Sequence, residues 1–246
     1  MKITLILLLS ASCSFKSLLV SKLDYFMTEK ISNELSLNGQ QEDELREDVK
    51  VFLNENKTSA KKLIDKLNKL NVEKPLPVET LKKQYQEIID RLMPILSKYY
   101  FKLSVEQRKE FFVYQESKNE EIKKQMSKIT VKSVSKKYDS FFGYINDEQK
   151  ALIGKSLPLI KEMAQIRIKR RIDIQQALKK AVTFDQVQSA FALFSKSLNK
   201  NSKLNDDFLT FISKLLEQTN NDQKETLKSK KIELIQILEY YITNTY

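Results

Sequence analysis

The residue types that usually carry catalysis are scarce in this sequence. Among 246 residues there is no histidine, one cysteine and three glycines. Without histidine, Ser-His-Asp and Cys-His machinery cannot be built, and general acid–base catalysis loses its most common agent. A single cysteine excludes an intramolecular disulfide framework and a multi-cysteine metal site. The three glycines lie too far apart for a glycine-rich phosphate loop. We therefore predict a protein that is not an enzyme and holds neither metal nor cofactor.

Two charged clusters are the remaining candidates for binding. Three of the six arginines fall within five positions, in the group Arg167, Lys169, Arg170 and Arg171. On a helix, positions 167, 170 and 171 share one face, which could hold a phosphate, a lipid headgroup or a carboxylate of a partner. The alternative is that these residues pair locally with Glu162 or Asp173, or lie in solvent. The acidic group Asp43, Glu44, Glu47 and Asp48 could bind a cation, but a solvated face near the N-terminus of a helix, where negative charge is favourable, is the preferred interpretation.

The only cysteine follows a segment that is typical of an export signal. Lys2 precedes a seven-residue run, 3–9, that is apolar except for Thr4, and small residues separate this run from Cys13. Such a run is too short to span a bilayer, which needs roughly 20 apolar residues, but it suits the core of a secretory signal. The segment resembles a bacterial lipobox, although Ser10 stands where Leu is usual. The resemblance implies a signal peptide over residues 1–12 and an acylated Cys13 as the mature N-terminus. An ordinary signal peptide, or a buried helix with an incidental cysteine, is the alternative.

Acyl chains on Cys13 would make membrane lipid the first partner, since several chains give stable anchoring. Ser14 follows the cysteine, and by its resemblance to lipoprotein sorting in Gram-negative bacteria this favours the outer membrane, with the protein facing the periplasm.

The net charge suggests a second hypothesis. The chain carries a formal +11, and removal of residues 1–12 takes away Lys2 alone and leaves +10. A soluble basic protein that binds nucleic acid or another polyanion would fit this charge and would show a steep salt dependence. However, only six of the 43 basic residues are arginine, the residue preferred for bidentate phosphate contacts. Nucleic acid is therefore the less favoured partner.

The hydrophobic pattern beyond residue 14 predicts an all-α fold. Apolar residues recur at helical spacing, and no alternating run indicates a strand. The expected bundle has about seven to nine helices, covering 18–31, 43–70, 79–101, 105–126, 134–142, 151–181, 184–198, 205–218 and 222–243. Pro94 and Pro158 are expected to kink their helices. Residues 13–246 are predicted to form one domain, with a possible subdivision at the proline-containing stretch 72–78. Aromatic residues at helix ends, such as Tyr99, Tyr100 and Phe101, are expected to pack between helices.

Five helix starts share a capping box closed by glutamine. In this motif the N-cap side chain accepts from the N3 amide, and the N3 side chain accepts from the N-cap amide. The pairs are Asn38 with Gln41, Ser104 with Gln107, Asn146 with Gln149, Thr183 with Gln186, and Asn220 with Gln223. The last three boxes are 37 residues apart, which would suit a hairpin repeat, but the apolar stripes between them do not align. Five independent helix starts suffice, so Gln107→Ala and Gln149→Ala are each expected to cost on the order of 1 kcal/mol or less.

The boxes carry a family resemblance. The stretch from Leu103 to Phe111, LSVEQRKEF, and that from Tyr138 to Leu152, YDSFFGYINDEQKAL, resemble two signatures of an uncharacterised family of helical proteobacterial lipoproteins. Leu23-Asp-Tyr-Phe26 with Leu37-Asn-Gly-Gln-Gln41 resembles its N-terminal helix and first box, although the tryptophans and a His-Arg pair typical of the family are absent. The resemblance spans about residues 13–180 and implies an address and an architecture, since the family has no established activity. The box pattern is also similar to that of Spy-type periplasmic chaperones, which implies a surface that holds other envelope proteins.

Together these observations predict a membrane-anchored lipoprotein of the cell envelope of a Gram-negative bacterium. Its role is expected to be binding, scaffolding or chaperone-like holding of an envelope protein.

Overall fold

The computed structural model describes residues 22–69, 78–199 and 202–244, so Cys13 and most of the stretch 72–78 lie outside the described residues. Within these ranges the fold is all-α, as the periodicity predicted, and contains eleven helices and no strand. The first six are α3 (Leu23–Leu35), α4 (Gly39–Glu55), α5 (Lys57–Lys69), α6 (Val78–Phe101), α7 (Val105–Ser127) and α8 (Val131–Phe142). The others are α9 (Asp147–Lys155), α10 (Leu157–Lys180), α11 (Phe184–Asn199), α12 (Ser202–Glu217) and α13 (Asn221–Asn244).

The expected count of seven to nine helices is too low because two predicted helices are each divided at one residue. Asn56 separates α4 from α5, and its side-chain amide donates to the Phe52 carbonyl at 2.7 Å. Ser156 separates α9 from α10, which places Pro158 in the first turn of α10. Proline is tolerated there because the amide it lacks would have no intrahelical acceptor. The kink expected at Pro158 is therefore a helix boundary, whereas Pro94 lies inside the continuous helix α6.

Two hydrophobic clusters hold the described helices together. The larger is built on α3, α4, α6 and α7. It also includes Ala60 of α5, the ends of α10 and α13, and the start of α11. Tyr99 and Tyr100 are buried there, as expected for aromatic plugs. The smaller cluster joins α8, α9 and α12 with the starts of α10 and α13, and includes Phe142, Ile145, Ile153 and Leu215.

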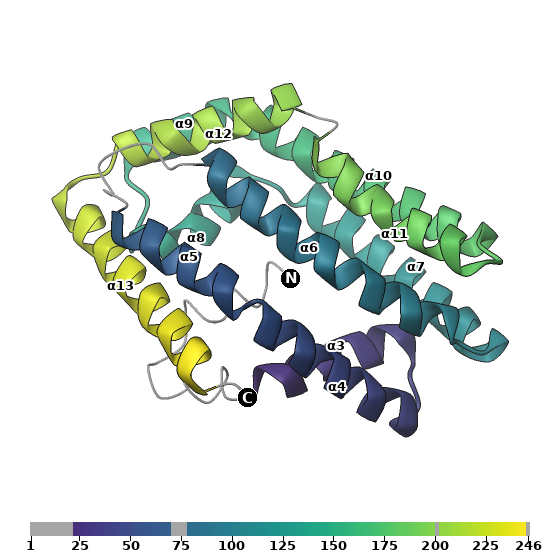
Figure 1. Ribbon diagram of the computed structural model, residues 1–246. Coiled ribbons are helices and arrows are strands. Elements are labelled where there is room, and N and C mark those ends of the chain that lie inside the picture. The colour runs from purple at the N-terminus through teal and green to yellow at the C-terminus, as the bar shows by residue number, and fades with distance from the viewer. Residues whose placement is uncertain (1–21, 70–77, 200–201, 245–246) are drawn as a thin grey trace.

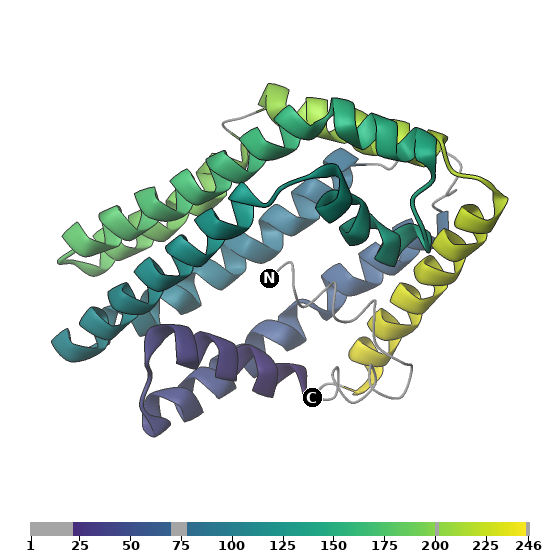
Figure 2. The ribbon, with the colours of Figure 1, turned by 180° about the vertical axis from the view of Figure 1, so that it is seen from behind.

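The arrangement is an elongated frame (Figures 1 and 2). At one side α13 lies along α5, and at the opposite side α11 lies between α6 and α10. The α9 and α12 helices run together along a third side, shown at the top of Figure 1. The turn between α6 and α7 and the turn between α10 and α11 project at the same end of the molecule. No helix within the described ranges is long and apolar enough to cross a membrane.

Candidate functional site

All five predicted capping boxes are formed. In each box the backbone N–H of the N-cap residue donates to the side-chain oxygen of the glutamine. The backbone N–H of the glutamine donates in return to the side-chain oxygen of the N-cap residue. A sixth box, at the start of α8, pairs Thr130 with Ser133. This box was not predicted, because its closing residue is serine and not the Glu or Gln of the usual pattern.

In four of the boxes the glutamine also forms a hydrogen bond to the glutamine of another box, so that these boxes are joined in two pairs. The Nε2 group of Gln107 donates to Oε1 of Gln41 at 2.7 Å and to the carbonyl of Ser36, also at 2.7 Å. In return, Nε2 of Gln41 lies 3.5 Å from the carbonyl of Lys102. We call this pair of glutamines the first clasp. It joins the α3–α4 turn to the α6–α7 turn.

The second clasp repeats this pattern with Gln149 and Gln223. Nε2 of Gln223 donates to Oε1 of Gln149 at 2.8 Å and to the carbonyl of Tyr144 at 2.7 Å. Nε2 of Gln149 donates to the carbonyl of Leu215 at 3.1 Å. Both glutamines of this clasp have no exposed surface, so their amide groups depend on these bonds. In the remaining box, the side-chain oxygen of Gln186 accepts from the backbone N–H groups of Val182 and Thr183, and the backbone N–H of Gln186 donates to the Thr183 hydroxyl. These bonds are all local.

The four basic residues predicted as an anion site do not form one surface. Arg170 stacks over the Phe194 ring of α11, with its guanidinium carbon 4.7 Å from the ring centroid. Arg171 points to α7, where its Nε donates to Asn119 at 2.8 Å and its Nη2 donates to Gln115. Arg167 and Lys169 are exposed. The structure thus divides the two adjacent arginines between two helix contacts.

Arg171 belongs to a buried amide cluster between α7 and α10. The Asn119 amide donates to Gln175 at 2.6 Å, and Gln115, Asn119 and Gln175 are all buried. Burial lowers the pKa of the Arg171 guanidinium below its ordinary value. Its two contacts are neutral amides, so the cluster joins two helices without an ion pair.

The acidic group on α4 pairs with α6 and the residue that follows it. Asp48 accepts from Lys98 at 2.6 Å and from the Tyr99 hydroxyl at 2.9 Å, while Glu44 accepts from Lys102 at 2.7 Å. The Lys102 ammonium holds the pKa of Glu44 below its usual value, and burial together with the Asp48 bond raises that of Tyr99. These contacts have a structural role, and in the described part of the chain no three acidic or cysteine side chains are grouped so as to hold a metal ion.

An exposed apolar surface lies next to the first clasp, and we call it the apolar tip. It is built on Phe101, at the end of α6, and Phe184, at the start of α11, with the exposed Val105 and Val182 within four residues of them along the chain. The Phe101 and Phe184 rings pack edge to face with centroids 5.6 Å apart. Val105 and Val182 each expose 78% of their surface. Phe101 was expected to pack between helices, and it does pack on Phe184 of α11, but 40% of its surface stays exposed. Periodicity alone does not show that a second turn ends beside it.

No family model, curated protein or solved structure matches this chain.

Proposed function

We propose that this protein is a non-enzymatic binding or scaffold protein of the bacterial envelope that engages a protein partner through its apolar tip. The carrying observation is the exposure of the tip: two phenylalanines, 36–40% exposed, stand beside two valines that are more than three-quarters exposed. Exposed apolar groups that gather at one end of a molecule, rather than being scattered, mark interaction surfaces. The polar groups beside them are engaged in the first clasp and in ion pairs.

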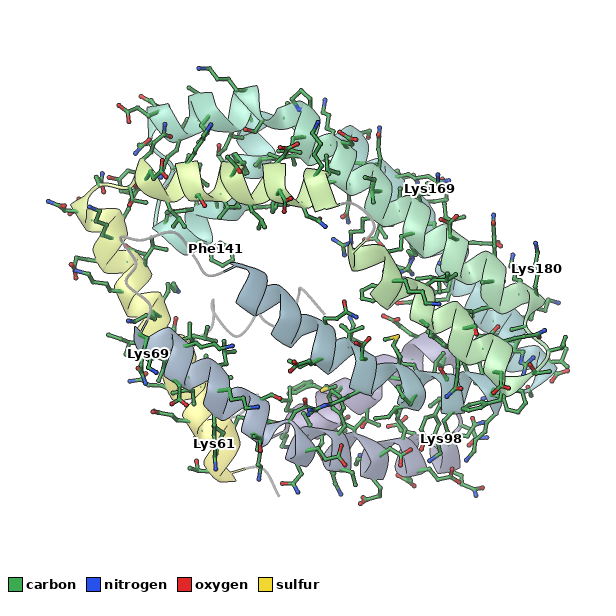
Figure 3. The ribbon with its side chains drawn as sticks, turned by 45° about the horizontal axis from the view of Figure 1, so that its top comes forward. Lys61, Lys69, Lys98, Phe141, Lys169 and Lys180 are labelled. Atoms are coloured by element: carbon green, nitrogen blue, oxygen red, sulfur yellow. The ribbon has the colours of Figure 1, made fainter. Side chains whose placement is uncertain are left out.

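The charges near the tip favour a protein partner over nucleic acid. Lys98, Lys102 and Lys179 each pair with a carboxylate, at 2.6 to 2.8 Å. The lysines labelled in Figure 3 lie on three helices, α5, α6 and α10, on opposite sides of the frame. A nucleic-acid interface needs unpaired positive charge gathered along one face. Lysines that are paired near the tip and dispersed elsewhere do not supply such a track of positive charge for phosphates.

The proposed address rests on the sequence around Cys13 and on the lipoprotein resemblance. We propose that residues 1–12 are removed, that acyl chains on Cys13 hold the protein in the membrane, and that the helical body faces the periplasm. Intact mass of the membrane-fraction protein tests this. A chain that starts at acylated Cys13, and is lost in Cys13→Ser, is expected. An unmodified chain starting at Met1 would favour the nucleic-acid hypothesis.

Site-specific photo-crosslinking tests the tip in cells that make the protein. A photoreactive residue at position 182 is expected to give a discrete crosslinked protein, and Val105→Glu in the same chain is expected to abolish it. The matched control is a photoreactive residue at Val51, an exposed valine on α4 away from the tip. Identical products from positions 182 and 51, or no product from either, would contradict binding at the tip.

A further inference from the structure

We infer that the chain consists of two copies of one four-helix module, fused end to end. The first copy spans residues 23–127 and the second spans residues 131–244. The inference does not depend on the proposed function, because it rests on helix order, clasp geometry and buried positions. The segment 128–130 is the link between them.

The order of the helices repeats, and so do the lengths of the first and last helices. Each copy begins with a short helix, of 13 residues in α3 and 12 in α8. A long helix divided at one residue follows, α4–α5 or α9–α10. A third helix, α6 or α12, leads to the second box, and the last helix has 23 residues in α7 and 24 in α13. Both first helices end at a residue with positive φ, Ser36 at 53° and Gly143 at 82°.

The clasps occupy the same place in each copy. One box always starts the second helix and the other starts the fourth. In both clasps the glutamine of the fourth helix donates to the glutamine of the second helix. It also donates to the backbone carbonyl that stands two residues before the N-cap of the second helix, which is Ser36 in the first copy and Tyr144 in the second. Two pairs of boxes would not share both acceptors if they were merely generic helix starts.

The buried positions and helix contacts also correspond. Seven residues after the first N-cap stand Leu45 and Ile153, and five residues before the second N-cap stand Tyr99 and Leu215. All four are fully buried. The first helix packs on the second and on the fourth in each copy, and the second packs on the third. The two copies therefore have the same packing scheme, although few residues are identical.

The copies differ by one added helix, α11, which carries the fifth box. It lies in the second copy but packs on α6 of the first, between α6 and α10. This explains why the Thr183 box has no partner box and why the 37-residue spacing is not the repeat. The added helix also brings Phe184 to Phe101, so the apolar tip exists only at the first clasp.

Double-mutant cycles in the full chain test the equivalence of the clasps. We expect Gln41→Ala with Gln107→Ala, and Gln149→Ala with Gln223→Ala, to lower the urea midpoint by less than the sum of the single losses. Gln186→Ala combined with Gln107→Ala is the control and is expected to be additive. Additivity at either clasp would overturn the inference.

Two further measurements keep the inference falsifiable if a variant fails to fold. In the unmodified protein, NMR is expected to show through-hydrogen-bond couplings from the Gln107 side-chain amide to the Ser36 carbonyl and from that of Gln223 to Tyr144. Replacing residues 37–41 by the sequence of 145–149 is expected to keep a single cooperative unfolding transition. Absence of either coupling, or loss of cooperative unfolding in the exchange, would show that the two segments do not play the same part.

Discussion

The glutamine that closes a helix cap is an ordinary residue by sequence, and Gln149 shows how burial changes its importance. Its Oε1 accepts from the Asn146 amide and from Gln223, while its Nε2 donates to Leu215. Removing it leaves buried polar groups unsatisfied, so we expect Gln149→Ala to lower the free energy of unfolding by about 2–3 kcal/mol. Gln186→Ala is expected to cost about 1 kcal/mol or less. For Gln149→Ala this larger loss replaces the loss of about 1 kcal/mol or less that capping alone predicts. Equal losses of the two variants in urea melts would contradict the difference between them.

Two glycines should respond oppositely to alanine. Gly143 has φ of 82°, and an added Cβ would lie 3.3 Å from Oγ1 of Thr226, so we expect Gly143→Ala to destabilise by about 1–2 kcal/mol. Gly39 lies at the start of α4 with nothing within 4 Å of the new methyl group. Gly39→Ala should stabilise by about 0.5–1 kcal/mol through helix propensity and a less flexible unfolded chain. Thermal melts of both variants beside the parent check the two signs.

Tyr100 should make stability depend on alkaline pH. Its hydroxyl donates to the Leu178 carbonyl at 3.2 Å, and burial raises its pKa to about 12 from an ordinary value near 10. Between those values the unfolded chain loses the proton while the folded chain keeps it, so stability is full below pH 10 and falls as the pH rises toward 12. Urea melts from pH 8 to 11 should show a shallower fall for Tyr100→Phe. An unchanged slope would contradict the role of this hydroxyl.

At the scale of elements, the polar contacts between α7 and α10 are of two kinds, buried amide contacts and a surface ion pair. Arg171 reaches the buried amide cluster, whereas the Lys179–Glu116 pair, 2.8 Å apart, lies on the surface. We expect Arg171→Met to lower the free energy of unfolding by about 1–3 kcal/mol, because Gln115 and Asn119 lose a donor in a buried site. Lys179→Ala is expected to change it by less than about 0.5 kcal/mol. If the two variants had equal melts, the amide cluster would not be the main polar link.

The two helix divisions also belong to this scale. Apolar residues recur at helical spacing on both sides of Asn56 and of Ser156, so each pair of helices was predicted as one long helix. The side chain of Asn56 instead bonds to the Phe52 carbonyl and accepts from Arg91 at 3.3 Å. The break at Asn56 follows from side-chain competition for a backbone carbonyl, which a hydrophobic pattern does not report. Ser156 forms no side-chain cap bond, and its break stands two residues before Pro158.

At the scale of the molecule, the two copies of the module pack directly against each other through three pairs of helices. The α5–α13, α6–α11 and α7–α10 contacts all cross between them. We therefore expect a protease site placed in segment 128–130 to be cut without separating the halves, which should elute together and keep their helical content. Separation of the halves on gel filtration after cleavage would contradict this expectation. Uncut protein carrying the same insertion is the control.

The features that could be predicted are those that depend on local sequence patterns. Helical class, most helix starts and all five glutamine boxes were readable because each depends on residues within four positions of one another. The pairing of the boxes depends on residues 66 and 74 positions apart, Gln41 with Gln107 and Gln149 with Gln223. The separation of Arg170 from Arg171 and the exposure of Phe101 likewise depend on which helices lie alongside. Sequence alone therefore determined how each helix begins, and tertiary packing decided which helix turns are joined and where the apolar tip forms, because those outcomes follow from contacts that no local pattern records.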